Sequence, residues 1–194
     1  RRFCRGAAVA VLLLALLAAY HNSFTASWHF DDFPNIVENA HVHMSALTWE
    51  SILQSMLGIE QRGLNRPLAY ASFALNYYVG GLDVFGYHFV NFAVHCLGAL
   101  LLFGFIRRTL ELPIFKGRYG RHSGEIACLA ALFWACNPVQ VSAVTYIVQR
   151  MAGLGALFYI ASLYGYLRGR TVQDGRARAA FYSLALISAL LALG

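Results

Sequence analysis

Residues 85–106 read FGYHFVNFAVHCLGALLLFGFI, a run that contains no Asp, Glu, Lys or Arg. A helix of about 20 apolar residues crosses the hydrocarbon core of a bilayer, and this run has that length. The whole chain is 59% hydrophobic and only 12% charged, a composition outside the range of soluble domains. We therefore predict an integral membrane protein of the all-α class, a polytopic bundle of helices that contacts membrane lipid.

Four more apolar stretches flank this run, which gives about five predicted spans: residues 6–24, 85–106, 124–136, 141–167 and a last one that starts near Ala179. Pro138 makes a turn natural between the third and fourth spans, which would form a tight hairpin. A cleaved signal peptide is the alternative for the first span, but no clean small-residue cleavage site follows it. The predicted divisions are a first transmembrane helix at 1–24, an outer loop at 25–84 and four further transmembrane helices at 85–194, the last truncated. We accordingly expect this chain to be a piece of a longer protein.

The basic residues predict the orientation of these spans. Twelve of the fifteen Lys and Arg residues lie in three segments, 1–5, 107–121 and 168–178. Loops with an excess of Lys and Arg face the cytoplasm, so the N-terminus is predicted to be cytoplasmic and loop 25–84 to face the periplasm or lumen. Since the charge follows the membrane sides, the pI near 9.4 does not indicate a nucleic-acid partner.

The outer loop is too long to be a simple connector. Residues 45–57 have apolar side chains near helical spacing, and Thr48 or Ser45 can cap such a helix. Residues 67–78 form a second amphipathic stretch, which begins at Pro67. We predict that both are interfacial helices lying on the membrane.

Asp31 and Asp32 follow directly after the first span and are the candidate catalytic residues. Two close carboxylates push their pKa values apart, so one can act as a base while the other orients a hydroxyl or supports a divalent cation. Mg or Mn would suit such oxygen ligands, although the sequence leaves the metal unknown. The alternative is that the pair only ends a helix in a solvated loop.

Arg150 lies on an otherwise apolar helix and needs a partner, which could be a carboxylate of the outer loop or a lipid phosphate. Snorkelling to the headgroups is the alternative. His88, Asn91 and His95 recur at i, i+3 and i+7 and so share one face of a helix. Hydrogen bonds between helices are favoured over a haem or metal site on this face, and no haem is expected.

The motifs taken in order resemble the N-terminal membrane half of the transmembrane, tetratricopeptide-repeat-containing O-mannosyltransferases and their bacterial relatives, which are glycosyltransferases of the GT-C class. The resemblance covers nearly the whole chain. It rests on Phe30-Asp31-Asp32-x-Pro34-Asn35-Ile36, Asn65-Arg66-Pro67-Leu68, Ser72-Phe73-Ala74-Leu75-Asn76-Tyr77, Gly80-Gly81-Leu82-Asp83, Gly86-Tyr87-His88-x-x-Asn91-x-x-x-His95, Asn137-Pro138-Val139-Gln140 and Ala143-Val144-Thr145-Tyr146-Ile147-x-x-Arg150.

This resemblance implies an enzyme that takes a sugar from a polyprenyl-phosphate carrier and transfers it, with inversion, to an acceptor hydroxyl of a protein on the outer face. The acidic pair of such enzymes lies in the active site, which corresponds to Asp31 and Asp32. Arg66 and Arg150 are the candidates for neutralising the departing phosphate. Asn65 and His88 complete the expected substrate-binding set.

The sequence departs from the family pattern at Asn137, where a His is usual, and at Ser142, where an acid is usual. A non-catalytic membrane subunit that packs against other membrane proteins is therefore the second hypothesis, and a haem- or quinone-bearing redox subunit is a third. The sequence does not identify the sugar or the acceptor.

Overall fold

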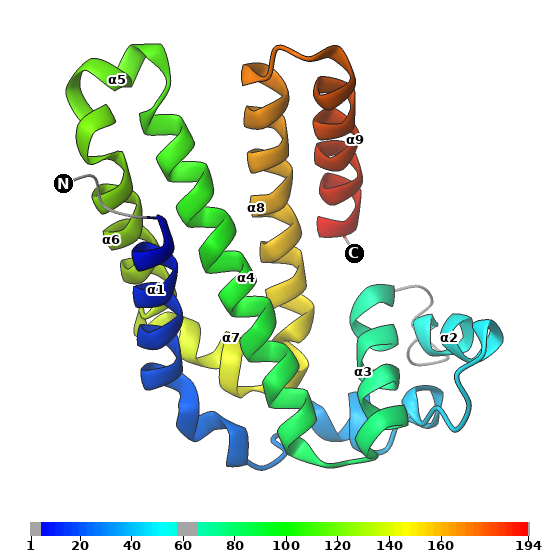
Figure 1. The fold of residues 1–194 in the computed structure, drawn as a ribbon. Helices are drawn as coiled ribbons and strands as arrows, with labels where there is room; N and C mark the ends of the chain where they lie inside the picture. Colours follow the sequence, from blue (N-terminus) through cyan, green and yellow to red (C-terminus); the bar gives the residue numbers. More distant parts are fainter. Residues whose placement is uncertain (1–4, 58–65, 194) are drawn as a thin grey trace.

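The computed structural model describes residues 5–57 and 66–193, and these residues form helices and loops without a strand (Figure 1). The fold is therefore all-α, as predicted. The helices in chain order are α1 (Arg5–Tyr20), η1 (His21–Thr25), η2 (Phe33–Val37), η3 (Ala40–Val42), α2 (Trp49–Met56), α3 (Pro67–Gly80), α4 (Val84–Leu110), α5 (Pro113–Tyr119), η4 (Gly120–His122), α6 (Ser123–Ala135), η5 (Pro138–Gln140), α7 (Val141–Thr145), η6 (Ile147–Gln149), α8 (Arg150–Thr171) and α9 (Gly175–Ala192).

Among the described residues, three helical segments are long and apolar enough to cross a membrane: Gly6–Thr25, Val84–Leu110 and Ile147–Thr171. A fourth span arises if Pro113–Ala135 and Pro138–Thr145, which are bent by 54° relative to each other, cross together. The chain is thus an integral membrane protein. The described residues contain three or four candidate spans, fewer than the five that were predicted. The predicted third span is short because the 13 residues of α6 rise only about 20 Å, and α9 is an 18-residue helix with Arg176 and Arg178 in its first two turns.

The predicted fourth span is also wrong as a single helix. A continuous helix was expected over 141–167, whereas the backbone leaves the helix at Tyr146 with φ −94° and ψ 112° and resumes as η6 and α8. The 54° bend at Pro138 lies just before this break, so the chain turns twice between α6 and α8.

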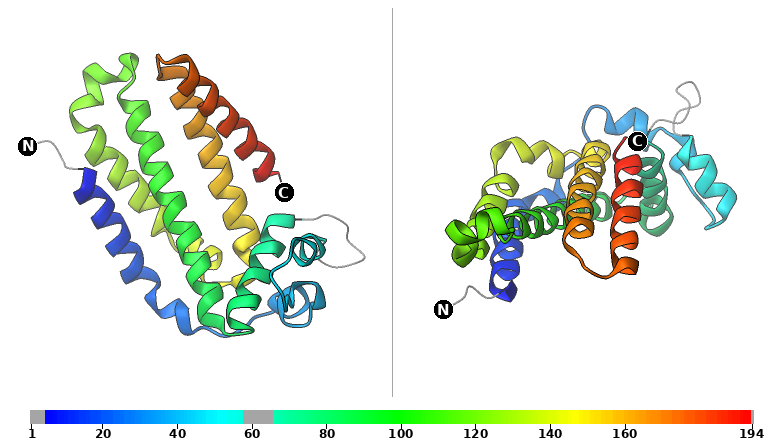
Figure 2. Two further views of the ribbon diagram at one scale, coloured as in Figure 1. Left: turned by 45° about the vertical axis from the view of Figure 1, so that its right-hand side comes forward. Right: turned by 90° about the horizontal axis from the view of Figure 1, so that it is seen from above.

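Helix α4 is the central element of the bundle, with α1 and α6 on one side and α8 on the other (Figure 1). Small residues let the neighbouring helices approach closely: Ala127 and Ala131 of α6 pack with Leu12 of α1 and Phe103 of α4. Helix α9 returns antiparallel along α8 and ends near α3, as the two views of Figure 2 show.

The predicted outer loop is a folded layer at one end of the bundle. Both predicted interfacial helices form, as α2 and α3, and Thr48 caps α2 by accepting a hydrogen bond from the Ser51 amide. Helix α3 buries Phe73 against Tyr87 and Ile147, so it belongs to the core of this layer. Helix α2 lies further out and leaves Trp49 71% exposed, which suits a helix at a lipid headgroup region.

Candidate functional site

The site is built around the break between α7 and α8. A helix that breaks inside an apolar bundle leaves backbone N–H and C=O groups without partners, at a cost of about 1–3 kcal/mol for each. Two polar side chains from other segments replace the missing partners. Asp32 Oδ1 accepts the Val148 amide at 2.7 Å, and Asn91 Nδ2 donates to the carbonyls of Tyr146 at 3.3 Å and Ile147 at 3.1 Å.

Asp32 is fully buried, and backbone amides occupy both of its oxygens. Its Oδ2 accepts the amide of His29 at 3.0 Å, while its own amide donates to the His29 carbonyl at 2.8 Å. Burial raises the pKa of the Asp32 carboxyl above its ordinary value, and the two amide donors oppose that rise. Asp32 therefore ties the end of the first span to the start of α8, and neither of its oxygens is open toward solvent.

Asp31, in contrast, is exposed. Its backbone is held at both ends: its amide donates to Tyr146 Oη at 2.9 Å, and its carbonyl accepts Asn35 Nδ2 at 2.7 Å. The two adjacent carboxylates thus differ in environment, with one fixed inside and one presented outside. This difference permits the separate roles that were predicted for the pair.

Phe30, directly before the pair, adopts a left-handed backbone with φ +38° while its side chain is 85% exposed. A bulky residue seldom takes this conformation, which costs about 1–3 kcal/mol and persists only where the surrounding contacts impose it. Here the turn between His29 and Asp32 imposes it. An exposed aromatic residue thus directly precedes the exposed Asp31.

The polar face of α4 holds the ends of three other helical segments. His88 Nε2 contacts the Ala26 carbonyl at 3.0 Å after η1, Asn91 holds the α7–α8 break, and His95 Nε2 contacts the Ala135 carbonyl at 2.9 Å at the end of α6. Tyr20 donates to the same Ala135 carbonyl at 2.8 Å. The prediction of interhelical hydrogen bonds on this face is confirmed.

Arg150 is the first residue of α8 and is fully buried, so the snorkelling alternative is wrong. Four of its five N–H donors have neutral acceptors. These acceptors are Asn91 Oδ1 at 2.7 Å, Ser72 Oγ at 3.1 Å, Asn76 Oδ1 at 2.7 Å and the Tyr87 carbonyl at 2.8 Å.

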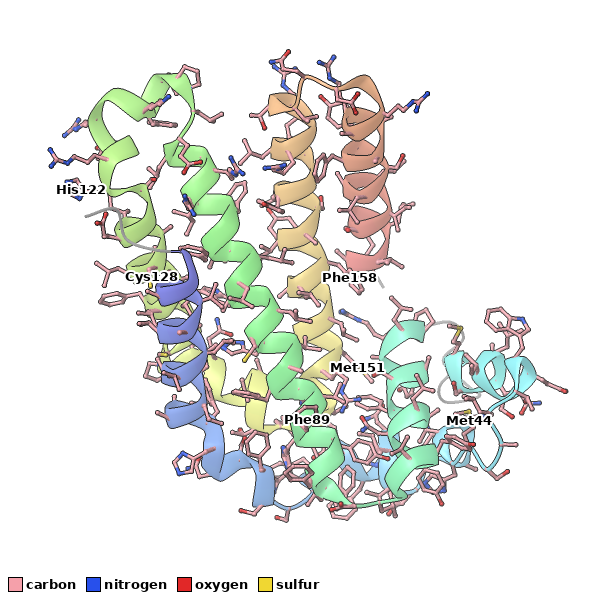
Figure 3. The ribbon with its side chains drawn as sticks, in the orientation of Figure 1. Met44, Phe89, His122, Cys128, Met151 and Phe158 are labelled. Atoms are coloured by element: carbon pink, nitrogen blue, oxygen red, sulfur yellow. The ribbon has the colours of Figure 1, made fainter. Side chains whose placement is uncertain are left out.

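Aromatic rings complete the environment of this cation, with the Arg150 guanidinium carbon 4.7 Å from the centroid of Phe73 and 5.7 Å from that of Tyr87. The expected carboxylate partner is not among its contacts in the described residues. Arg150 thus joins α3, α4 and α8 through neutral groups. Figure 3 labels the next residue, Met151, where α8 faces α3.

Arg150 also lines a cavity of about 160 Å³ between α4 and α8, together with His95, Trp134, Gln140 and Gly153. The cavity is lined mainly by apolar atoms. Direct binding of a lipid phosphate by Arg150 stays a prediction.

Arg66 is exposed, in contrast to Arg150. It caps the start of α3 with φ +57°, and its side chain reaches toward α8, where a Cβ added to Gly155 would lie 3.7 Å from Arg66 Nη1. Arg66 thereby keeps an accessible positive charge on the same layer as Asp31. Asn65, which precedes it, lies outside the described residues.

The structure gives His88 an interior position. Its side chain is fully buried, Nε2 is used by the Ala26 carbonyl, and Nδ1 has no hydrogen-bond partner among the described residues. A substrate-binding role for His88 stays a prediction.

The described residues do not assemble a set of protein ligands for a metal. Within residues 5–57 and 66–193, no three His, Cys, Asp or Glu side chains come together in a way that could hold an ion. Both oxygens of Asp32 are taken by amides, so a cation near the pair would have Asp31 as its one protein carboxylate there. Binding of Mg or Mn at the Asp31–Asp32 pair stays a prediction.

The sequence did not identify the residues that position Asp31 and Arg150 by hydrogen bonds. Tyr146 fixes the Asp31 backbone, and Ser72, Asn76 and Tyr87 hold Arg150. All four lie inside the motifs quoted above, so their presence there was the available signal. Their partners, however, are between 63 and 115 residues away in the sequence, and no local pattern reveals such distant pairs.

Comparison with known proteins finds similarity to protein O-mannosyl-transferases. The chain is 31% identical to protein O-mannosyl-transferase TMTC1 of Mus musculus over 170 residues, and this alignment covers 83% of the chain. It is 29% identical to protein O-mannosyl-transferase TMTC4 of Homo sapiens over 186 residues, an alignment that covers 87% of the chain. It is 26% identical over 167 residues to TMTC3 of Mus musculus. The matched parts make up 17%, 24% and 17% of these relatives, so the chain spans about a fifth of their length. No protein-family model and no solved structure matches the chain.

Proposed function

Because the chain resembles the TMTC protein O-mannosyl-transferases over most of its length, we propose that it is the membrane portion of an enzyme that transfers mannose to a protein hydroxyl. The observation that carries the proposal is the pair of opposite environments at Asp31 and Asp32, one exposed and one buried. A base must be able to reach its substrate, and a positioning residue must be fixed. The two adjacent carboxylates meet these two requirements separately.

In the proposed reaction, the Asp31 carboxylate takes the proton of the acceptor hydroxyl. The acceptor oxygen then forms a bond to the anomeric carbon of the sugar, and the bond from that carbon to the carrier phosphate breaks with inversion. The electron pair of that bond leaves with the phosphate. Asp32 positions the base by holding its backbone turn against the Val148 amide, because orientation accounts for much of the rate in such transfers.

We propose a polyprenyl phosphate as the carrier of the sugar, with Arg66 as the exposed cation that neutralises the departing phosphate. A guanidinium forms paired hydrogen bonds with phosphate oxygens, and Arg66 lies at the start of a helix in the same layer as Asp31. The layer of residues 25–84 faces the periplasm or lumen in this proposal, with the N-terminus in the cytoplasm.

The test is transfer of mannose from a synthetic polyprenyl-phosphate mannose to a Ser- or Thr-containing peptide, measured with the whole protein in detergent. Asp31→Asn is expected to lower the rate by about 10²–10⁴, the contribution of a positioned base. The control is Glu38→Gln, which removes an exposed carboxylate of the same layer and is expected to leave the rate unchanged. Full transfer by Asp31→Asn would refute Asp31 as the base, and the layer would then have a structural role.

Arg66→Gln tests the carrier separately. The variant is expected to raise the KM for the polyprenyl donor while the KM for the peptide stays the same. An unchanged donor KM would refute the phosphate role of Arg66.

A further inference from the structure

A second polar region lies at the opposite end of α4. An open cavity of about 950 Å³ is formed by the end of α4, by α5 with the following turn, and by the start of α6. Its charged lining consists of Arg107, Arg108, Glu111, Lys116, Arg121 and Glu125. Figure 3 labels His122, another lining residue, at this end of the molecule, far from Met44 in the outer layer. The proposed transfer reaction uses none of these residues.

The positive charge of this cavity is only partly neutralised. Glu111 is shared by two cations, with its oxygens 3.1 Å from Arg107 Nε and 3.4 Å from Arg108 Nη1. Glu125 contacts His122 at 3.2 Å. Lys116 and Arg121 have no ion-pair partner within the described residues. One carboxylate neutralises only one of its two arginines, so Arg107 and Arg108 keep a positive charge between them. The exposed Lys116 and Arg121 add to this charge beside the turn between α5 and α6.

The cavity lies at the level of a lipid headgroup. From His88, beside the Asp31–Asp32 layer, to Arg107 there are 19 residues of α4, a rise of about 28 Å. The hydrocarbon core of a bilayer is about 30 Å thick, so the cavity and the layer lie at opposite surfaces of the membrane.

Exposed apolar side chains lie on α5, the same short helix that carries Lys116. Ile114, on α5, is 82% exposed, and Phe115 is 38% exposed. At the level of the headgroups, exposed apolar side chains of this kind can contact the upper part of the acyl chains. A ligand that combines an anionic head with apolar chains fits this arrangement better than free phosphate does.

We propose that this cavity binds the phosphate headgroup of an anionic phospholipid, with Lys116 and Arg121 as its principal ligands and the acyl chains beside Ile114. The tendency of one membrane side to collect basic residues explains the sign of the charge. It does not explain a cavity that gathers four Lys and Arg side chains around an open space large enough for a headgroup. Basic pockets between transmembrane helices bind anionic headgroups in this way.

The experiment is native mass spectrometry of the whole protein, titrated in detergent with phosphatidylglycerol or with phosphatidylcholine as the neutral reference. Phosphatidylglycerol is expected to bind at least about tenfold more tightly. The double variant Lys116→Gln/Arg121→Gln removes two cations, each worth on the order of fivefold, and is expected to weaken phosphatidylglycerol binding by about 30-fold.

The matched control is Arg170→Gln/Arg176→Gln. It removes two exposed arginines near the turn between α8 and α9, at the same end of the molecule but outside the cavity, and is expected to leave phosphatidylglycerol binding unchanged. Glu111→Gln frees Arg107 and Arg108 from their carboxylate and is expected to tighten binding, a gain that misfolding cannot produce.

Three results would overturn the proposal. Equal binding of the two lipids would show that charge is not recognised. Equal losses in the cavity variant and the control variant would show a general effect of surface charge. Displacement of phosphatidylglycerol by inorganic phosphate at comparable concentration would assign the cavity to free phosphate instead of a lipid.

Discussion

Asn91→Leu is expected to lower the free energy of unfolding by about 3 kcal/mol. The asparagine is 2% exposed, and its side chain makes three hydrogen bonds. Leucine leaves the Nε of Arg150 unpaired, at about 2–3 kcal/mol for a charged donor, and leaves the Ile147 carbonyl without a donor, at about 1 kcal/mol more. The longer bond to the Tyr146 carbonyl adds a smaller loss, and the apolar contacts of leucine return about 1 kcal/mol.

The assay is reversible unfolding by SDS in mixed micelles, followed by the fluorescence of the three tryptophans. Asn22→Leu makes the same chemical change at an exposed position and is expected to change the free energy by less than about 0.5 kcal/mol. Asn91→Asp keeps an acceptor for Arg150 but turns a carboxylate toward two carbonyls, so its cost is expected to lie between the other two. A cost below about 1 kcal/mol for Asn91→Leu would refute the conclusion that this side chain holds the helix break.

Three further predictions use the same unfolding assay. The free energy of unfolding is expected to fall as the pH rises above 3.8, because burial raises the pKa of Asp32 and the folded state holds this proton more tightly than the unfolded state does. Asp32→Asn should remove the contribution of this carboxyl to the pH dependence, and the same pH dependence in both proteins would contradict the prediction. Gly165→Ala is expected to cost about 1–3 kcal/mol, because the new Cβ would lie 3.2 Å from the backbone of both Phe181 and Ala185, and a neutral result would show that α9 can shift freely. Phe30→Gly is expected to raise the free energy of unfolding by about 0.5–1 kcal/mol by relieving the left-handed backbone, and a loss would mean that the exposed ring has unrecognised contacts.

Hydrophobic runs and charge counts predicted the class of the fold and the location of most helices. The apolar run at 85–106 lies wholly within α4, and Thr48 caps α2 as expected. The break at Tyr146 could not be predicted, because neither proline nor glycine lies within residues 141–150 to indicate the end of a helix. It depends on Asp32 and Asn91, which are more than 50 residues away in sequence.

The candidate site was predicted in composition but not in geometry. The sequence singled out Asp31 and Asp32, yet it could not indicate which carboxylate is buried, since that depends on the backbone amide of Val148. Arg150 was expected to have a charged partner, because a buried cation usually has one. Three neutral side chains and a carbonyl replace that partner, and their convergence exists only in the folded chain.

The contacts of the polar face of α4 fix the spacing of His88, Asn91 and His95 along this helix. One residue inserted between Asn91 and His95 would rotate everything after it by about 100° and move it by about 1.5 Å, which would turn His95 away from the end of α6 while His88 stayed on the end of η1. Insertions in a loop on the surface are absorbed at small cost, whereas this change would disconnect one helix from another. Relatives of this chain are therefore expected to differ freely at the lipid-facing positions of α4 and in the lengths of their loops, but to keep the seven-residue interval from His88 to His95 unchanged.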